Sequence, residues 1–313
     1  MPRNTVFLYP GQGSQHVGMG FDIYQDHSEM RQIFDRADRF LGFSLSRLCF
    51  EGPIEELNQD LNAQLAIYTL SCGLTEILKK QNIRPGAVTG YSSGFYAAAY
   101  AAGCFDFSYG LEIVWRAGKI LIDEGHKING SMAVIFGLPF KQVARICQQL
   151  KNAQVAIINT PRQIIISGLH ASIKKAMALS LDAGALDAYI LPAATAYHSG
   201  FMKKSRERFL NEIKDQYLKS PLVPLMSYFT LDYVNSQKEL KEIMASQLSN
   251  PVLWVDLIKK LGHNNNKRLL IEVGPGAVLF RTVRWIDRKF EIVITATEEK
   301  LKKAINKHNL KSE

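Results

Sequence analysis

Apolar residues recur along the chain with two different spacings, and together these predict an α/β fold. The run TVFLY at 5–9 is short, apolar and rich in strand formers, and it ends at Pro10-Gly11. This predicts a buried strand followed by a loop. A second strand is predicted at 87–91, directly before an Ala-rich helix that ends near Gly103. Apolar residues three and four positions apart predict further helices at 21–41, 54–81 and 109–125.

The order of predicted elements changes between Ser131 and Pro192. The predicted elements here are a strand at 131–136, a helix at 140–150, strands at 155–158 and 163–167, a helix at 171–183 and a strand at 188–191. The order βαββαβ is that of the ferredoxin-like, split-βαβ arrangement. We therefore expect a larger α/β domain over 1–128 and 197–313, interrupted by a small ferredoxin-like domain over 129–196.

The larger domain continues after the insertion with helices and strands in turn. Its predicted helices cover 203–218, 237–246 and 252–261, and its predicted strands cover 222–228 and 269–273. The chain has 313 residues, of which 47% are hydrophobic and 21% are charged. These values are typical of a globular protein with a substantial core.

The chain is basic, with a formal net charge of +9. Such a charge suits an acidic partner, which could be nucleic acid, an anionic membrane or an acidic protein, but it can equally be a solvated surface. The only dense basic run, from Lys300 to Lys311, has the composition of a frayed polar end.

Four widely spaced cysteines form no C-x-x-C pair, so they indicate neither a zinc site nor a disulfide scaffold. They are typical of small buried residues in a reducing compartment. We find no secretory signal and no apolar run long enough to span a membrane. A cytoplasmic enzyme is therefore expected.

The segment Gly90-Tyr91-Ser92-Ser93-Gly94 fits the pattern G-x-S-x-G, with a predicted strand before it and a predicted helix after it. A serine on such a tight turn has an exposed hydroxyl and a strained backbone. The N–H of the next residue, Ser93, then points at a developing oxyanion. The context favours Ser92 as a nucleophile over an ordinary Gly/Ser turn.

A nucleophilic serine needs a general base. Of the seven histidines, His198 lies where the chain re-enters the larger domain, and clefts often form at such junctions. Spacing alone leaves a structural and a catalytic role equally open for it.

The loop at 10–15, PGQGSQ, follows the first strand. It lacks the third glycine of a dinucleotide-binding loop and the Gly-Lys-Ser/Thr of a P-loop. We expect it to offer the Gln12 amide beside the nucleophile. Arg116, in the helix that follows the Ala-rich one, could bind a carboxylate or form a structural ion pair, and its spacing favours the ion pair.

Seven short motifs in register resemble the malonyl-CoA:acyl-carrier-protein transacylases and the acyltransferase domains of polyketide synthases. They cover the chain from about residue 5 to about residue 285, and are YPGQGSQ (9–15), GYSSG (90–94), Arg116, NTP (159–161), YHS (197–199), QLSNP (247–251) and EVGPG (272–276). The resemblance implies an α/β-hydrolase-like domain with an inserted ferredoxin-like domain.

The resemblance also implies a role for each matching residue. Ser92 corresponds to the nucleophile, His198 to the general base, and Gln12 with the N–H of Ser93 to the oxyanion hole. The backbone carbonyl of Gln247 would steady the histidine. The implied substrate-binding residues are Arg116, which would bind the malonyl carboxylate, and Gln64, Tyr91, Asn159 and Tyr197. No metal or bound cofactor is implied.

The sequence departs from the family pattern at three places near the site. Tyr91 stands where histidine is usual, Ser93-Gly94-Phe95 replaces Leu-Gly-Glu, and Thr195-Ala196-Tyr197 matches neither common polyketide selectivity signature. These changes alter the pocket rather than the Ser92–His198 pair.

The hypothesis from the sequence is ping-pong transfer of a malonyl group from coenzyme A to the phosphopantetheine thiol of an acyl carrier protein, by a monomer that binds neither nucleic acid nor membrane. The alternatives are an acyl hydrolase, a polyketide acyltransferase with another acyl preference, and a non-catalytic docking subunit. The pathway, whether fatty-acid synthesis, polyketide assembly or malonate decarboxylation, is not indicated.

Overall fold

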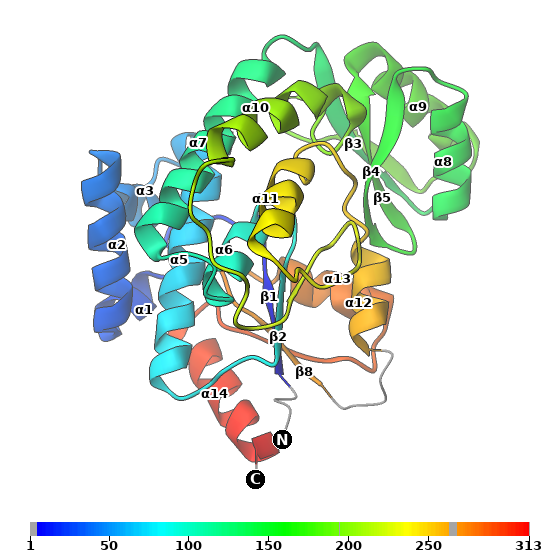
Figure 1. The fold of residues 1–313 in the computed structure, drawn as a ribbon. Helices are drawn as coiled ribbons and strands as arrows, with labels where there is room; N and C mark the ends of the chain where they lie inside the picture. Colours follow the sequence, from blue (N-terminus) through cyan, green and yellow to red (C-terminus); the bar gives the residue numbers. More distant parts are fainter. Residues whose placement is uncertain (1–4, 194, 263–267, 313) are drawn as a thin grey trace.

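The computed structural model describes residues 5–193, 195–262 and 268–312. Within them, a parallel five-stranded sheet forms the centre of the larger domain (Figure 1). Its strands in spatial order are β7 (Leu225–Met226), β2 (Ala87–Gly90), β1 (Thr5–Tyr9), β8 (Leu269–Glu272) and β9 (Glu291–Ile294). Every residue of β1, β2 and β8 is buried, as expected of parallel strands with helices on both faces.

Helices cover this sheet and extend beyond it. Before the insertion they are α1 (Phe21–Asp26), α2 (Ser28–Leu41), α3 (Leu45–Glu51), α4 (Ile54–Leu57), α5 (Asp60–Lys80), α6 (Gly94–Ala101) and α7 (Phe107–Gly125). After it they are α10 (Lys203–Ile213), α11 (Gln237–Ser246), α12 (Trp254–Gly262), α13 (Val278–Ile286) and α14 (Glu298–Ser312), with a short 3₁₀ turn η1 (Gly200–Met202).

The inserted segment forms a separate antiparallel sheet with two helices. Its elements are β3 (Gly130–Phe136), α8 (Phe140–Gln148), β4 (Ala153–Thr160), β5 (Gln163–Leu169), α9 (His170–Asp182) and β6 (Asp187–Ile190). The strand order β4-β5-β3-β6, with every neighbouring pair antiparallel, is the arrangement that βαββαβ predicts. The predicted fold, an α/β domain with an inserted ferredoxin-like sheet, is confirmed, while the domain limits at 129 and 196 stay predictions.

Backbone hydrogen bonds fix the inserted sheet to the larger domain. Val252 donates to the carbonyl of Ala156 at 2.8 Å, and its own carbonyl accepts from Ile158 at 2.9 Å. The segment that enters α12 therefore extends the edge of β4. This contact places the inserted sheet beside the carboxyl ends of β1 and β2, where a site is expected in an α/β fold.

Some predicted elements differ from the observed ones. The predicted helix at 21–41 is interrupted at His27, which has extended backbone and separates α1 from α2. The predicted strand at 222–228 pairs only at Leu225–Met226.

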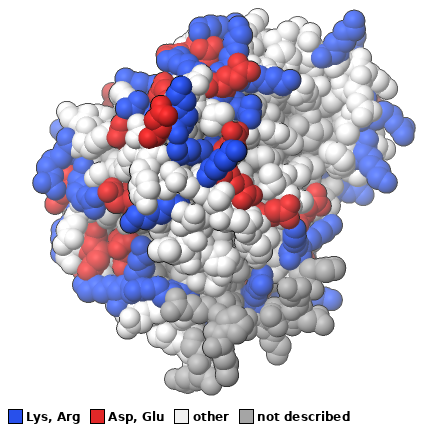
Figure 2. All heavy atoms as spheres, in the orientation of Figure 1, with Lys and Arg blue, Asp and Glu red and all other residues white. Residues whose placement is uncertain are grey.

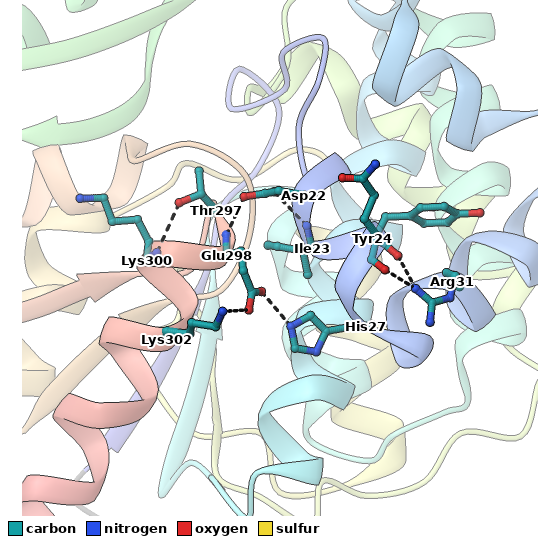
Figure 3. Close-up of polar contacts among 10 residues, drawn as sticks. Asp22, Ile23, Tyr24, His27, Arg31, Thr297, Glu298, Lys300 and Lys302 are labelled. Atoms are coloured by element: carbon teal, nitrogen blue, oxygen red, sulfur yellow. Dashed lines mark hydrogen bonds and ion pairs between the residues drawn. The ribbon is translucent and has the colours of Figure 1, made fainter.

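The basic C-terminal run was wrongly expected to be a frayed end, because it lies in α14. Leu301 and Ala304 of that helix are buried against the core. Figure 3 shows its first turn beside α1 and α2, where the carboxylate of Glu298 pairs with His27 at 2.8 Å and its N–H donates to Asp22 at 2.7 Å. The helix is otherwise polar. It is held in place by the two buried apolar side chains, which lie three residues apart, and by the contacts of Glu298.

Charged side chains cover much of the face of the molecule drawn in Figure 2. On the face drawn in Figure 2, Lys and Arg lie beside Asp and Glu over much of the larger domain, whereas the inserted domain at the right shows basic side chains with few acidic neighbours. Its exposed basic residues include Lys141, Arg145, Lys174 and Lys175. The net charge of +9 is therefore not evenly distributed over this face.

Candidate active site

Ser92 lies on a tight turn between β2 and α6. Its φ is 52°, a left-handed conformation that is strained for serine. A Cβ on Gly90 would lie 2.2 Å from the backbone carbon of Gly94, and a Cβ on Gly94 would lie 2.2 Å from the carbonyl oxygen of Tyr9. Both glycines are needed because the strand and the helix approach this closely. The predicted strand–turn–helix context of Ser92 is therefore present.

His198 lies within hydrogen-bond distance of Ser92, with its Nε2 2.8 Å from the serine Oγ. On the other side of the ring, Nδ1 lies 3.0 Å from the carbonyl oxygen of Asn250. A carbonyl can only accept, so Nδ1 carries the proton and Nε2 is the free base that accepts from the serine.

Burial keeps this histidine neutral. Its side chain is almost fully enclosed, and desolvation lowers its pKa to about 4, although the carbonyls of Asn250 and Gln247 oppose the shift. Near neutral pH the ring is therefore an unprotonated base, with its tautomer set by a backbone carbonyl instead of a carboxylate.

The carbonyl of Gln247 was predicted to steady His198, but the direct hydrogen bond comes from Asn250, three residues later. The carbonyl of Gln247 also acts on the ring, since it too opposes the lowering of the His198 pKa. The side chain of Gln247 lies in the site: its Oε1 accepts from the Tyr228 hydroxyl at 3.3 Å, and its Nε2 has no hydrogen-bond partner among the described residues.

Gln12 lies beside the nucleophile turn. Its N–H points at the Oγ of Ser93 at 3.3 Å, a long hydrogen bond, and its side-chain amide donates to Asp60. A Cβ on Gly11 would lie 2.4 Å from the carbonyl oxygen of Tyr91, so the loop can lie this close only with glycine there. The N–H of Ser93 makes no hydrogen bond within the described part of the chain. These two N–H groups can serve as donors to an oxyanion.

Ser92 and His198, called the dyad below, line a cavity of about 440 Å³. This size is typical of small-molecule sites. The cavity is lined by Gln12, Gly13, Gln15, Asn58, Gln64, Tyr91, Ser92, Ser93, Tyr96, Leu121, Met132, Ile157, Ile165, Leu191, Pro192, Ala193, Tyr197, His198, Tyr228, Gln247 and Leu248. The structure thus brings together the predicted residues Gln12, Gln64, Tyr91, Ser92, Ser93, Tyr197, His198 and Gln247. Asn159 lies directly behind this lining, since its Oδ1 accepts from the Tyr91 hydroxyl at 2.5 Å.

Arg116 is the predicted site residue that the structure places elsewhere. It does not line the cavity, and its side chain is 37% exposed. Its guanidinium pairs with Glu112 at 2.7 Å and Glu212 at 3.5 Å. The structural ion pair that its spacing favoured is the arrangement observed, and the carboxylate-binding role implied by the resemblance stays a prediction.

Sequence reasoning missed two residues of the site. Asp60, at the start of α5, accepts from both the Gln12 amide and the Tyr197 hydroxyl, and so joins the loop after β1 to the segment that carries His198. No local pattern marks it. Asn250 lies within the motif QLSNP, but a backbone carbonyl carries no side-chain signature.

No group of three or more His, Cys, Asp or Glu residues suited to a metal ion occurs among the described residues. In the same part of the chain, no helix combines the length and apolarity that crossing a bilayer requires.

Comparisons with known proteins agree with this geometry. The family model described as "Acyl transferase domain" matches residues 6–303. A malonyl CoA-acyl carrier protein transacylase of Bacillus subtilis is 34% identical, with 96% of each chain covered. A transacylase structure of the same name from Coxiella burnetii has a TM-score of 0.93 at 28% identity, covering 98% of both chains. A malonyl-transacylase solved in complex with a type II polyketide acyl-carrier protein also gives 0.93, at 26% identity, covering 97% of this chain and 99% of that one. The chain belongs to the acyl transferase family.

Proposed function

We propose that this protein transfers a malonyl group from coenzyme A to the phosphopantetheine thiol of an acyl carrier protein, through an acyl-enzyme on Ser92. The observation that carries the reaction is the 2.8 Å contact between the Oγ of Ser92 and the unprotonated Nε2 of His198, both of which line the cavity. The names of the related proteins, including one bound to a carrier protein, support the donor and the acceptor.

The first half-reaction forms the acyl-enzyme. His198 takes the hydroxyl proton of Ser92 while Oγ attacks the thioester carbon. The N–H groups of Gln12 and Ser93 stabilise the oxyanion, each contributing about 3 kcal/mol in comparable sites. The C–S bond then breaks, and the coenzyme A sulfur leaves with the proton returned by His198.

The second half-reaction runs the same steps in reverse. His198 takes the proton of the carrier's thiol, whose sulfur attacks the ester carbon of acyl-Ser92. The ester bond breaks and Oγ regains the proton. Nothing in these steps needs a group other than the dyad and the two N–H donors. A cytoplasmic location and a monomeric state belong to the same proposal.

Mass spectrometry of the intact protein tests the reaction. Malonyl-CoA alone should add one malonyl group to the wild type and none to Ser92→Ala, and addition of a phosphopantetheinylated carrier should discharge it onto the carrier. An adduct that survives Ser92→Ala would disprove the assignment of the nucleophile.

The same experiment separates a transferase from an acyl hydrolase. Because Arg116 lies outside the cavity, it gives no reason to prefer a malonyl transferase over a hydrolase of uncharged acyl groups. An acyl-enzyme that releases free acid as fast without carrier as with it would favour the hydrolase. Discharge that depends on the carrier supports the transferase.

A further inference from the structure

One wall of the cavity is apolar and comes from both domains. Its side chains are Leu121 from α7, Met132 from β3, Ile157 from β4, Ile165 from β5, and Leu191 just after β6. All of them except Leu191 are buried, and they belong to the main hydrophobic core or pack against it. The wall is thus a continuation of the protein interior, held in place by α7 and the inserted sheet.

Among the described residues that line the cavity, none carries a charge at neutral pH. None is Lys, Arg, Asp or Glu, and desolvation lowers the pKa of His198 to about 4. Arg116, the cation expected here, is paired with Glu112 and Glu212 outside the lining. A carboxylate in this cavity would meet no cation in the described lining, so the lining does not favour a charged acyl group over a neutral one.

The polar lining consists of neutral groups. The Gln64 amide makes no hydrogen bond among the described residues, and the buried Tyr96 hydroxyl lies close to the side chain of Gln247 without a hydrogen bond of ordinary geometry. Tyr91 and Tyr197 already donate, to Asn159 and Asp60 respectively. Amide and hydroxyl donors can bind the oxygen of a carbonyl as well as that of a carboxylate, and none of them is a cation that would require the acyl group to be charged.

We propose that the cavity also accepts neutral short-chain acyl groups, so that acetyl-, propionyl- and butyryl-CoA acylate Ser92 alongside malonyl-CoA. The inference rests on the proposed function and names a further substrate class for it. The step is the same: the serine Oγ–acyl bond forms, the acyl–sulfur bond breaks, and His198 passes the proton to the coenzyme A sulfur.

The apolar wall sets an order among the neutral groups. Each methylene buried against Leu121, Met132 and Ile165 should favour acylation by about fourfold. Butyryl-CoA has two methylenes more than acetyl-CoA and should therefore load about tenfold to twentyfold faster. A receptor built for a carboxylate would show no such order.

The test is competition for Ser92 among equimolar malonyl-, acetyl- and butyryl-CoA, read by intact mass after a short reaction. We expect the butyryl adduct within about tenfold of the malonyl adduct, and ahead of the acetyl adduct. A malonyl preference above about a hundredfold would overturn the inference and leave the proposed function intact. If no adduct forms, or if every adduct is hydrolysed and none is transferred to the carrier, the proposed function would be overturned instead.

Two variants locate the selectivity. Leu121→Arg adds a cation to the wall and should raise the ratio of malonyl to butyryl loading by at least about 30-fold, as expected of a close charge pair. The matched control Arg116→Gln, five residues earlier on the same helix, should leave the ratio unchanged. A drop of more than tenfold in Arg116→Gln would contradict the inference. If Leu121→Arg does not fold, as judged by its thermal unfolding, Met132→Lys makes the same test from β3.

Discussion

The nucleophile turn and the apolar wall that shares its cavity are built in different ways. The turn is local: Ser92 and the two glycines that permit its conformation lie within five residues, between one strand and one helix. The wall is assembled from α7 and three strands of the inserted sheet, far apart in the chain. The hydroxyl of Ser92 is therefore positioned by the local backbone conformation, whereas the wall consists of side chains positioned by long-range packing.

This difference means that the chemistry and the choice of acyl group can be changed separately. A substitution in the wall alters contacts with the acyl chain but leaves the strained turn and the His198 tautomer as they are. A substitution at the dyad removes the reaction for every substrate. Four measurements sharpen or break this comparison.

The largest effect should come from removing the base. His198→Ala should slow acylation of Ser92 at least about a thousandfold for every acyl-CoA, because the hydroxyl loses its proton acceptor. Met132→Leu, a wall change of similar volume, should keep the rate with the preferred substrate within about threefold. Rapid-quench mass spectrometry measures both, and similar losses in the two variants would show that the regions are not separable.

The next effect is the pH dependence of acylation. Since desolvation lowers the pKa of His198 to about 4, the base should be about 90% unprotonated at pH 5, whereas an ordinary histidine would be about 3% unprotonated. The acylation rate should stay nearly flat from pH 8 to pH 5 and fall towards pH 4. An inflection near pH 6.5 would show that the base is solvated.

The same shift affects folding, and its sign can be stated. The folded state binds fewer protons than the unfolded state between about pH 6.5 and pH 4, so stability decreases as the pH falls through this range. Circular dichroism at each pH distinguishes loss of fold from protonation of the base.

Asp60 joins the loop after β1, which lies beside the nucleophile turn, to the segment that carries His198, because it binds both Gln12 and Tyr197. Asp60→Asn keeps the shape but turns two charge-assisted hydrogen bonds into neutral ones, which should lower the acylation rate by about fivefold to tenfold. The expected change is in kcat more than in KM, since Gln12 acts on the oxyanion. The control Asp22→Asn, at the contact with α14, should leave kcat unchanged. Equal effects of the two variants would make Asp60 merely structural.

The smallest effect should be that of salt. Carrier proteins are typically acidic, and exposed Lys141, Arg145, Lys174 and Lys175 contribute to a net charge of +9. Transfer to the carrier should weaken by a few-fold as salt is raised, because exposed charges are screened beyond about 8–10 Å at physiological ionic strength. Wall variants should show the same salt dependence as the wild type. A flat profile would mean that the charge serves solubility alone.

The sequence predicted the local features well. The strand, the tight turn and the following helix around Ser92 could be read from five residues and their flanks. The βαββαβ order of the insertion could be read from alternating spacings. Each of these depends on neighbours in the chain, which is the information that a sequence pattern contains.

Features that depend on distant contacts could not be read in this way. Arg116 lies on a helix next to the cavity, but which face of α7 points inward is decided by how α7 packs against α5 and α10. Asp60 and the carbonyl of Asn250 reach the site through tertiary contacts, and no sequence pattern around either residue indicates these contacts. The polar composition around Lys300 concealed the two buried positions, Leu301 and Ala304, that dock α14.

The strand order has a consequence for the time at which the enzyme becomes active during synthesis. β1, made first, lies in the middle of its sheet and pairs with both β2 and β8. β8 and β9 leave the ribosome only after the whole inserted domain has been made. Since domains generally fold as units while the chain is being made, the inserted sheet, contiguous between Gly130 and Ile190, can form first. Ser92 and His198 are therefore both synthesised well before the sheet that supports Ser92 can be completed. A nascent chain should gain its acylation activity only when its last quarter has been made.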